Sequence, residues 1–325
     1  MRKGRLWLCA ALLAVLPAGR PLSFAAVQEA PVLSGMEQPV GEGTVQAGSE
    51  EEGTADAARR SLLSCAYYEE ASFLQSVDGA QPYPAEGRLR AGVVPHHLLA
   101  GRMIAAFFAR AAQDETHYES VILVGPSHYP VPDRMITAYS GWQTPFGTLE
   151  NDRTFTRRLV ENGRIAAMAD EAAMEKDHAL AGLIPYVRYY LPDAAVSTVL
   201  IQNTAPSSRV EALAGEISAY LREKPALLVC SVDFSHYLMP DAAAERDGQT
   251  RRALESYDYA AVSRFTDSNV DSPPALTVFL KNAESYGPVR FFDHGASDTI
   301  LSLPLTDPIY QDGTTTYFIL GAVEE

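Results

Sequence analysis

The sequence predicts an α/β protein with a single three-layer domain, in which helices cover both faces of a mostly parallel β-sheet. Two observations support this prediction. Short runs of apolar residues, such as those at 121–124 and 226–229, are typical of strands that are buried on both faces. These runs alternate with longer segments whose apolar residues recur at helical spacing, which is the pattern of βαβ units.

The composition is that of a globular protein, with 47% hydrophobic and 21% charged residues in a chain of 325. A chain of this length can bury a sizeable core. The formal net charge of −15 argues against nucleic acid as a partner, because no basic surface offsets it. The same charge favours solubility and cationic ligands such as metal ions.

The first 25 residues have the order of a signal peptide. Arg2, Lys3 and Arg5 precede an apolar run from Leu6 to Leu16, and small residues lie around Ala25. A membrane span needs roughly 20 apolar residues, so export to the periplasm or outside the cell is expected, with no stable span after cleavage. An uncleaved anchor is the alternative. Residues 26–57 are acidic, lack an apolar period and are expected to be a disordered linker, which leaves 58–325 as the folded domain.

Within that domain the periodicity predicts each element in turn. Helices are expected within 58–77 and over 98–112, 152–162, 177–190, 207–222, 241–257 and 273–284. Strands are expected at 91–95, 121–124, 134–139, 196–202, 226–232, 289–292 and 315–320. Cys65 and Cys230 lie in apolar surroundings, where they are either two buried thiols or, in an exported protein, a disulfide.

Three of the predicted strands are each followed by histidine, although the chain has only seven histidines. His96 follows the first strand, His128 the second, and Asp233 and His236 the third. Ligands of open α/β sheets bind at the carboxyl ends of the strands. Neighbouring parallel strands lie ~4.8 Å apart, so two imidazoles could reach one cation at the usual bond of roughly 2.0–2.2 Å.

Other polar residues have two interpretations each. Asp233 and His236 are either an acid–base pair beside a metal or a capping aspartate and a structural histidine. His178 follows the N-cap Asp177, so it either lines a cleft or lies on the surface. Asp271 precedes Pro273 and could do no more than cap a helix. Asp293 with His294 is one more candidate pair, and Ser127 and Ser235 are weak candidates for a nucleophile, because neither lies in a G-x-S-x-G elbow.

Several of these motifs, in this order, resemble the Memo family, known in bacteria as the AmmeMemoRadiSam system protein B. The motifs are Val93-Val-Pro-His-His97, Leu123-Val-Gly-Pro-Ser-His128, Asp177-His178 with Pro185-Tyr186, Ser231-Val-Asp-Phe-Ser-His236 and Thr316-Tyr-Phe-Ile-Leu-Gly-Ala322. The resemblance runs from about Arg88 to Val323. That family is similar in fold to class III extradiol ring-cleaving dioxygenases.

The resemblance implies a mononuclear site for a divalent metal, with Fe(II) expected first and Mn, Zn or Cu as alternatives. His96 and His128 match two ligands of the family, and Asp271 stands where Memo proteins usually have a cysteine. His178, Asp233 and His236 are then expected to line the pocket as catalytic residues without binding the metal. Two histidines and a carboxylate form the facial triad of non-haem Fe(II) enzymes, which suits harder cations than a thiolate does.

This chain departs from the family at three places. A second carboxylate is replaced by Ala181, Pro-His-Ala-Gly becomes Pro95-His-His-Leu98, and a tyrosine near the end of the chain is matched to His294. Two function classes therefore stay open: a redox enzyme or oxygenase acting on a small molecule, and a metal- or peptide-binding module without turnover. An exported metallohydrolase is a third. Partner proteins of the AmmeMemoRadiSam system are a further expectation from the resemblance.

Overall fold

The computed structural model describes residues 62–130, 135–302 and 313–325. The signal peptide predicted at 1–25 and the linker predicted at 26–57 lie outside the described residues, so both remain predictions. Among the helices of the described segments, none combines the length and apolar character that a membrane crossing requires.

The centre of the fold is a mixed, mostly parallel sheet of eight strands. In spatial order these are β10 (Arg290–Ala296), β11 (Thr316–Glu324), β2 (Arg88–Val94), β9 (Ala226–Ser231), β3 (Ser120–Pro126), β8 (Ala195–Ile201), β4 (Met135–Thr137) and β7 (Ala167–Ala169). Strands β2, β9, β3 and β8 are parallel neighbours. The antiparallel pairs are β10 with β11, β11 with β2, and β4 with β8.

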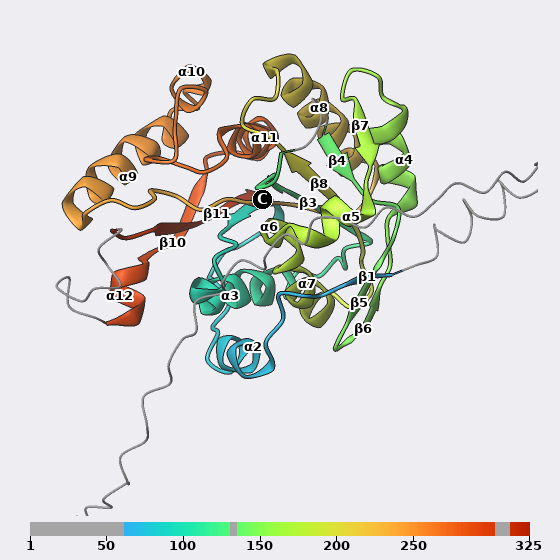
Figure 1. Ribbon diagram of the computed structural model, residues 1–325, viewed down its shortest axis with the longest axis horizontal. Coiled ribbons are helices and arrows are strands. Elements are labelled where there is room, and N and C mark those ends of the chain that lie inside the picture. Colours follow the sequence, from blue (N-terminus) through green and yellow to red (C-terminus); the bar gives the residue numbers. More distant parts are fainter. Residues whose placement is uncertain (1–61, 131–134, 303–312) are drawn as a thin grey trace, which may run out of the picture. The chain divides into compact units, whose positions relative to one another are not determined.

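Helices cover both faces of this sheet, as Figure 1 shows. One face packs against α2 (Glu70–Val77), α3 (Gly101–Ala111), α5 (Glu171–Lys176), α6 (His178–Ala181) and α7 (Ile184–Tyr190). The other packs against α4 (Arg153–Glu161), α8 (Ser207–Glu223), α9 (Pro240–Glu255), α10 (Tyr259–Val262) and α11 (Pro273–Ala283). The remaining helices are η1 (Leu98–Ala100), η2 (Glu284–Tyr286) and α12 (Ser297–Leu301).

Residues 121–124 of β3 are all apolar because both faces of the sheet are covered. Ile122 and Val124 belong to the hydrophobic cluster on one side of the sheet, whereas Val121 and Leu123 belong to the cluster on the other. Successive side chains of a strand point to opposite faces, so a strand covered on both sides needs apolar residues at every position. The predicted three-layer α/β class is confirmed.

Two helix predictions are wrong in part. Within 58–77, the described residues form a short strand, β1 (Leu63–Ser64), before the helix begins at Glu70. This strand joins β5 (Trp142–Thr144) and β6 (Gly147–Leu149) in a small second sheet that the apolar pattern did not reveal. The helix predicted over 177–190 is two helices, α6 and α7, and Pro185 at the start of α7 lacks the N–H that a continuous helix would need.

The strand order also corrects a premise about the site. His96 and His128 follow β2 and β3, which the sequence predicts to be neighbours, but β9 lies between these two strands. The two histidines therefore reach toward each other across the carboxyl end of β9. At the other end of the chain, β10 continues to Ala296, so Asp293 and His294 lie within this strand and do not follow it.

Candidate metal centre

Three imidazoles converge at the carboxyl edge of the central strands. His96 follows β2, His128 follows β3, and His178 is the first residue of α6. One ring nitrogen from each lies within 4.8 Å of the other two. The ring centroid of His96 is 5.2 Å from that of His128 and 5.4 Å from that of His178. Three nitrogen donors at this spacing can hold one metal ion.

The His96 ring is held by a hydrogen-bond chain. Its Nδ1 lies 3.1 Å from the hydroxyl of Ser231, and that hydroxyl donates to the carbonyl of Ala179 at 2.6 Å. Because the Ser231 hydroxyl donates to Ala179, its oxygen accepts a hydrogen bond from Nδ1–H, and the lone pair of the neutral ring lies on Nε2. Burial lowers the pKa of His96 to about 4, so this ring is neutral at physiological pH and is a competent metal ligand.

The His128 ring is oriented by Asp177. Oδ1 of this carboxylate lies 2.9 Å from Nδ1 of His128, while Oδ2 accepts the backbone N–H of His128 at 2.7 Å. A carboxylate that accepts a hydrogen bond from Nδ1–H leaves Nε2 free, as is usual for metal-bound histidines. Burial would raise the pKa of Asp177, but the hydrogen bonds from His128 and Ala179 lower it overall.

His178 lies directly on the His128 ring. The two rings are stacked, with centroids 4.1 Å apart and an angle of 27° between their planes. Burial, followed by the proximity of His128, lowers the pKa of His178. Two positively charged rings would repel each other at this distance, so the stack favours the neutral form of His178.

Asp271 brings a carboxylate to the same place. Its Oδ2 lies 3.3 Å from Nε2 of His96, and its Oδ1 accepts the backbone N–H of Asp233 at 3.2 Å. Oδ2 is buried and has no hydrogen-bond partner. Burial and the nearby charge of Asp233 raise the pKa of the Asp271 carboxyl. Asp271 therefore does more than precede a helix, and Ser272 is the residue whose side chain caps α11.

Asp233 and His236 line the same region from the segment after β9. Asp233 Oδ1 accepts the backbone N–H of His96 at 3.0 Å, and its Oδ2 lies 3.7 Å from Nε2 of His96. Burial lowers the pKa of His236, and the charge of Asp233 acts in the opposite direction. Nδ1 of His236 is buried without a hydrogen-bond partner. His178 lies among the candidate ligands, whereas the sequence placed it beside them.

The remaining candidates are not part of the cluster of three histidines. His294 pairs with the buried Asp247 at 2.8 Å, and Asp247 also accepts a hydrogen bond from Ser235 at 2.7 Å. Ser127 donates to the carbonyl of Tyr129. Among the described contacts neither serine hydroxyl bonds a histidine ring, so the arrangement for a serine nucleophile is not formed. Two tyrosines lie beside these histidines: the Tyr67 ring is 5.8 Å from that of His178, and the Tyr317 hydroxyl is 2.6 Å from Nδ1 of His97.

Sequence reasoning missed two residues that support the site. Asp177 was recognised as the N-cap of a helix, which it is, because its side chain accepts the N–H of Ala179. Nothing in the local pattern indicated that the same carboxylate holds His128. Ser231 is the last residue of a buried strand, and its proximity to a strand-end histidine was the only available indication.

The donor set fits a divalent metal ion. Neutral imidazole nitrogens suit Fe, Zn, Cu and Ni, and a carboxylate oxygen favours harder cations such as Fe(II) and Mn(II) over Cu(I). The unpartnered Oδ2 of Asp271 is a second indication, since a buried polar atom is normally paired. Neither thiol of the described residues takes part, because Cys230 lies in the hydrophobic cluster on one face of the sheet and Cys65 packs against the cluster on the other.

Comparison with known proteins gives the family. The model of one protein family, described as Memo-like protein, matches residues 68–300. The chain belongs to the Memo-like protein family. The resemblance seen in the sequence motifs is thereby confirmed, and the matched region contains His96, His128, His178 and Asp271.

Individual members of the Memo-like family are more distant. A MEMO1 family protein of Pyrobaculum arsenaticum is 27% identical over 217 residues, which are 63% of this chain and 76% of that protein. A MEMO1 family protein of Pyrobaculum aerophilum is 28% identical over 184 residues, which are 54% of this chain and 63% of that protein. The chain thus spans less than two thirds of the second relative. An uncharacterized Escherichia coli K12 protein of known crystal structure matches with a TM-score of 0.48 and 14% identity, covering 72% of this chain and 99% of that one.

Proposed function

We propose that this Memo-like protein is a mononuclear non-haem metal enzyme that oxidises a small molecule, with Fe(II) as its metal. The observation that supports the proposal is the convergence of His96, His128 and His178 beside the unpartnered carboxylate oxygen of Asp271. In this proposal the three histidines hold the metal and Asp271 supplies an anionic fourth donor. A redox-active metal held in this way supplies one-electron chemistry and a Lewis-acid position.

The protein's own residues set up that chemistry before any ligand arrives. Ser231 and Asp177 each accept a hydrogen bond from the Nδ1–H of one histidine, so that Nε2 of His96 and of His128 is free to bind. Burial keeps His96 neutral at physiological pH. Asp233, fixed by the backbone N–H of His96, places a carboxylate where it can take a proton from a bound substrate.

Metal loading tests the ligand set. The protein is purified without chelator, loaded anaerobically with Fe(II), Mn(II), Zn(II) or Cu(I), and its metal content is measured per chain. We expect one metal per chain, with loss of binding in His128→Ala, His178→Ala and Asp271→Ala. His294→Ala is the matched control, because this histidine pairs with Asp247 and is not part of the cluster. A parent protein that binds no metal would defeat the proposal, and unchanged loading in His178→Ala or Asp271→Ala would remove that residue from the ligand set.

Turnover is tested separately with the Fe(II)-loaded protein. Catechol is the first probe, because the resemblance noted in the sequence relates the Memo family to ring-cleaving dioxygenases. Oxygen consumption is compared with that of the Zn-loaded protein and of His128→Ala. Consumption that depends on Fe(II) and His128 supports an oxidising enzyme. A protein that binds the metal but consumes no oxygen with a panel of catechols would instead be a metal-binding module.

A further inference from the structure

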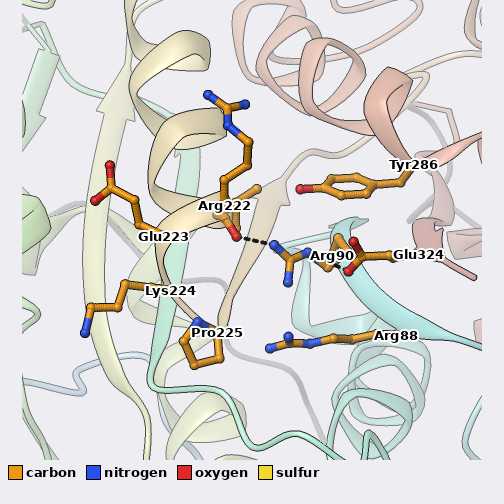
Figure 2. Close-up of a pocket in the computed structure, with 9 residues that line it drawn as sticks. Arg88, Arg90, Arg222, Glu223, Lys224, Pro225, Tyr286 and Glu324 are labelled. Carbon is orange, nitrogen blue, oxygen red and sulfur yellow. Dashed lines mark hydrogen bonds and ion pairs between the residues drawn. The ribbon is translucent and has the colours of Figure 1, made fainter.

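The edge of the sheet opposite the metal centre holds a pocket of about 410 Å³ with a basic lining. Arg88 and Arg90, at the amino end of β2, enter it from one side, and the end of α8 with Pro225 closes the other (Figure 2). His96 follows the carboxyl end of the same strand. A seven-residue strand is roughly 20 Å long, so the pocket is separate from the metal centre.

The guanidinium group of each arginine lies over a tyrosine ring. The regular alternation of β2 is broken at Arg90, where its register with β11 shifts, and both guanidiniums line the same pocket. The Arg88 guanidinium lies over the Tyr118 ring at 5.1 Å and that of Arg90 over the Tyr286 ring at 5.3 Å. Stacking of this kind fixes the guanidinium planes and leaves their N–H edges for an acceptor. Figure 2 shows both side chains and the Tyr286 hydroxyl directed toward the end of α8.

Several donors of these arginines lack an acceptor. Arg90 is 6% exposed, and the carbonyl of Leu221 accepts a hydrogen bond from its Nη2. Nε of Arg90 has no hydrogen bond and only the distant carboxylate of Glu324, 3.6 Å away. Nε and Nη2 of Arg88 are likewise buried without a partner. The hydrogen bond to the last turn of α8 gives an acceptor to one nitrogen of Arg90 and to none of Arg88. A buried donor without an acceptor lowers the stability of the folded protein.

The other charged residues of the pocket are engaged elsewhere. Arg222 donates to Ser218 at 2.7 Å, and Glu223 and Lys224 form ion pairs with residues that do not line the pocket. These pairs are Glu223 with Arg158 at 2.5 Å and Lys224 with Glu119 at 3.3 Å. The two inward guanidiniums therefore face a single carboxylate, that of Glu324, which is half exposed. In a chain of net charge −15, this pocket retains a local excess of positive charge.

We propose that this pocket binds a small oxyanion: a small molecule that presents a phosphate or carboxylate group to Arg88 and Arg90. Guanidinium forks match both groups with paired hydrogen bonds. The hydroxyl of Tyr286 offers a third donor, and Glu324 accepts from a donor elsewhere on the ligand. The volume lies within the range of small-molecule sites. A slight movement of the Arg88 side chain toward the anion gives its buried nitrogens the acceptor that they lack.

Inorganic phosphate is the first probe and acetate the second, each titrated by calorimetry against chloride at equal ionic strength. We expect saturable phosphate binding that Arg88→Gln weakens at least tenfold, since one charge-assisted hydrogen bond is worth that much. Arg90→Lys keeps the charge but loses the fork, and should also weaken binding. Arg102→Gln, at an exposed position of α3, is the matched control and should bind as the parent does. The probe that binds with the higher affinity identifies phosphate or carboxylate as the preferred group.

Two further measurements make the test decisive. His128→Ala must bind phosphate like the parent, because an anion held at the metal centre would be lost in that variant. Backbone amide shifts in the parent should move at Arg88, Arg90 and Tyr286, which keeps the test independent of how well the variants fold. Non-saturable binding of both probes, equal binding by parent and Arg88→Gln, or shifts confined to other regions would each overturn the proposal.

Discussion

Both oxygens of the Asp177 carboxylate contact His128, one at the ring and one at the backbone, with Oδ1 2.9 Å from Nδ1 and Oδ2 2.7 Å from the backbone nitrogen. The same Oδ1 accepts the N–H of Ala179 and so caps α6, the helix that begins with His178. One side chain thus fixes the ring of one candidate ligand and the helix that carries another.

Asp177→Asn should therefore weaken metal binding more than it weakens the fold. An amide can still cap the helix, but it no longer offers a charged acceptor for the Nδ1 proton. We expect metal affinity to fall by about 10–100-fold, measured by competition with a chelator. Asp170→Asn is the control, because Asp170 caps α5 in the same way without contacting a histidine. Equal losses in the two variants would contradict the assigned role of Asp177.

Metal binding should release a proton from Asp271. Burial and the charge of Asp233 raise the pKa of this carboxyl, so it holds its proton to a higher pH than a free aspartate does. A metal ion must displace that proton, and affinity should therefore rise with pH. Calorimetry in buffers of different ionisation enthalpy measures the protons released. We expect fewer in Asp271→Asn, and identical release in both proteins would show that Asp271 does not ligate.

Two glycine substitutions should have opposite effects on stability. A Cβ on Gly92 would lie 2.2 Å from the Phe107 ring and 3.0 Å from the carbonyl oxygen of Leu320. Gly92→Ala should therefore lower the free energy of unfolding by about 1–3 kcal/mol. Gly215, within α8, has nothing within 4 Å of the same position, so Gly215→Ala should raise it by roughly 0.5–1 kcal/mol. Urea denaturation measures both, and a destabilised Gly215→Ala would contradict the packing described for α8.

The two described cysteines should react slowly with thiol reagents and should not form a disulfide. Both are free, and burial raises the pKa of the Cys65 thiol to about 12 and that of Cys230 further. The thiolate is the reactive form, so at pH 8 almost none is present and labelling should accelerate as pH rises. Labelling in urea provides the control for full reactivity. Rapid labelling of the folded protein at pH 8 would show that the core is open.

We propose export as well, since the first 25 residues have the charged, apolar and small-residue order of a signal peptide. N-terminal sequencing of the protein from its native host should find the chain beginning at Ala26. An intact Arg2 in a soluble intracellular pool would count against export.

The sequence alone determined the layers and the edge at which the site lies. Apolar runs such as Val121–Val124 are typical of strands covered on both faces, and polar residues that follow such strands lie at their carboxyl ends. This placed His96, His128 and Asp233 on one edge of the sheet. The family motifs added Asp271, whose carboxylate does lie beside His96.

Only the tertiary structure decided which residues meet. Local periodicity does not encode strand order, so the insertion of β9 between β2 and β3 could not be deduced. Helix α6 reaches the site because Gly125 of β3 lets it approach closely: a Cβ there would lie 2.9 Å from Leu180 and 3.1 Å from Ser231. That contact joins segments far apart in the chain. It places His178 on His128 and directs the carboxylate of Asp177 to Nδ1, because packing between layers, rather than sequence spacing, sets these distances.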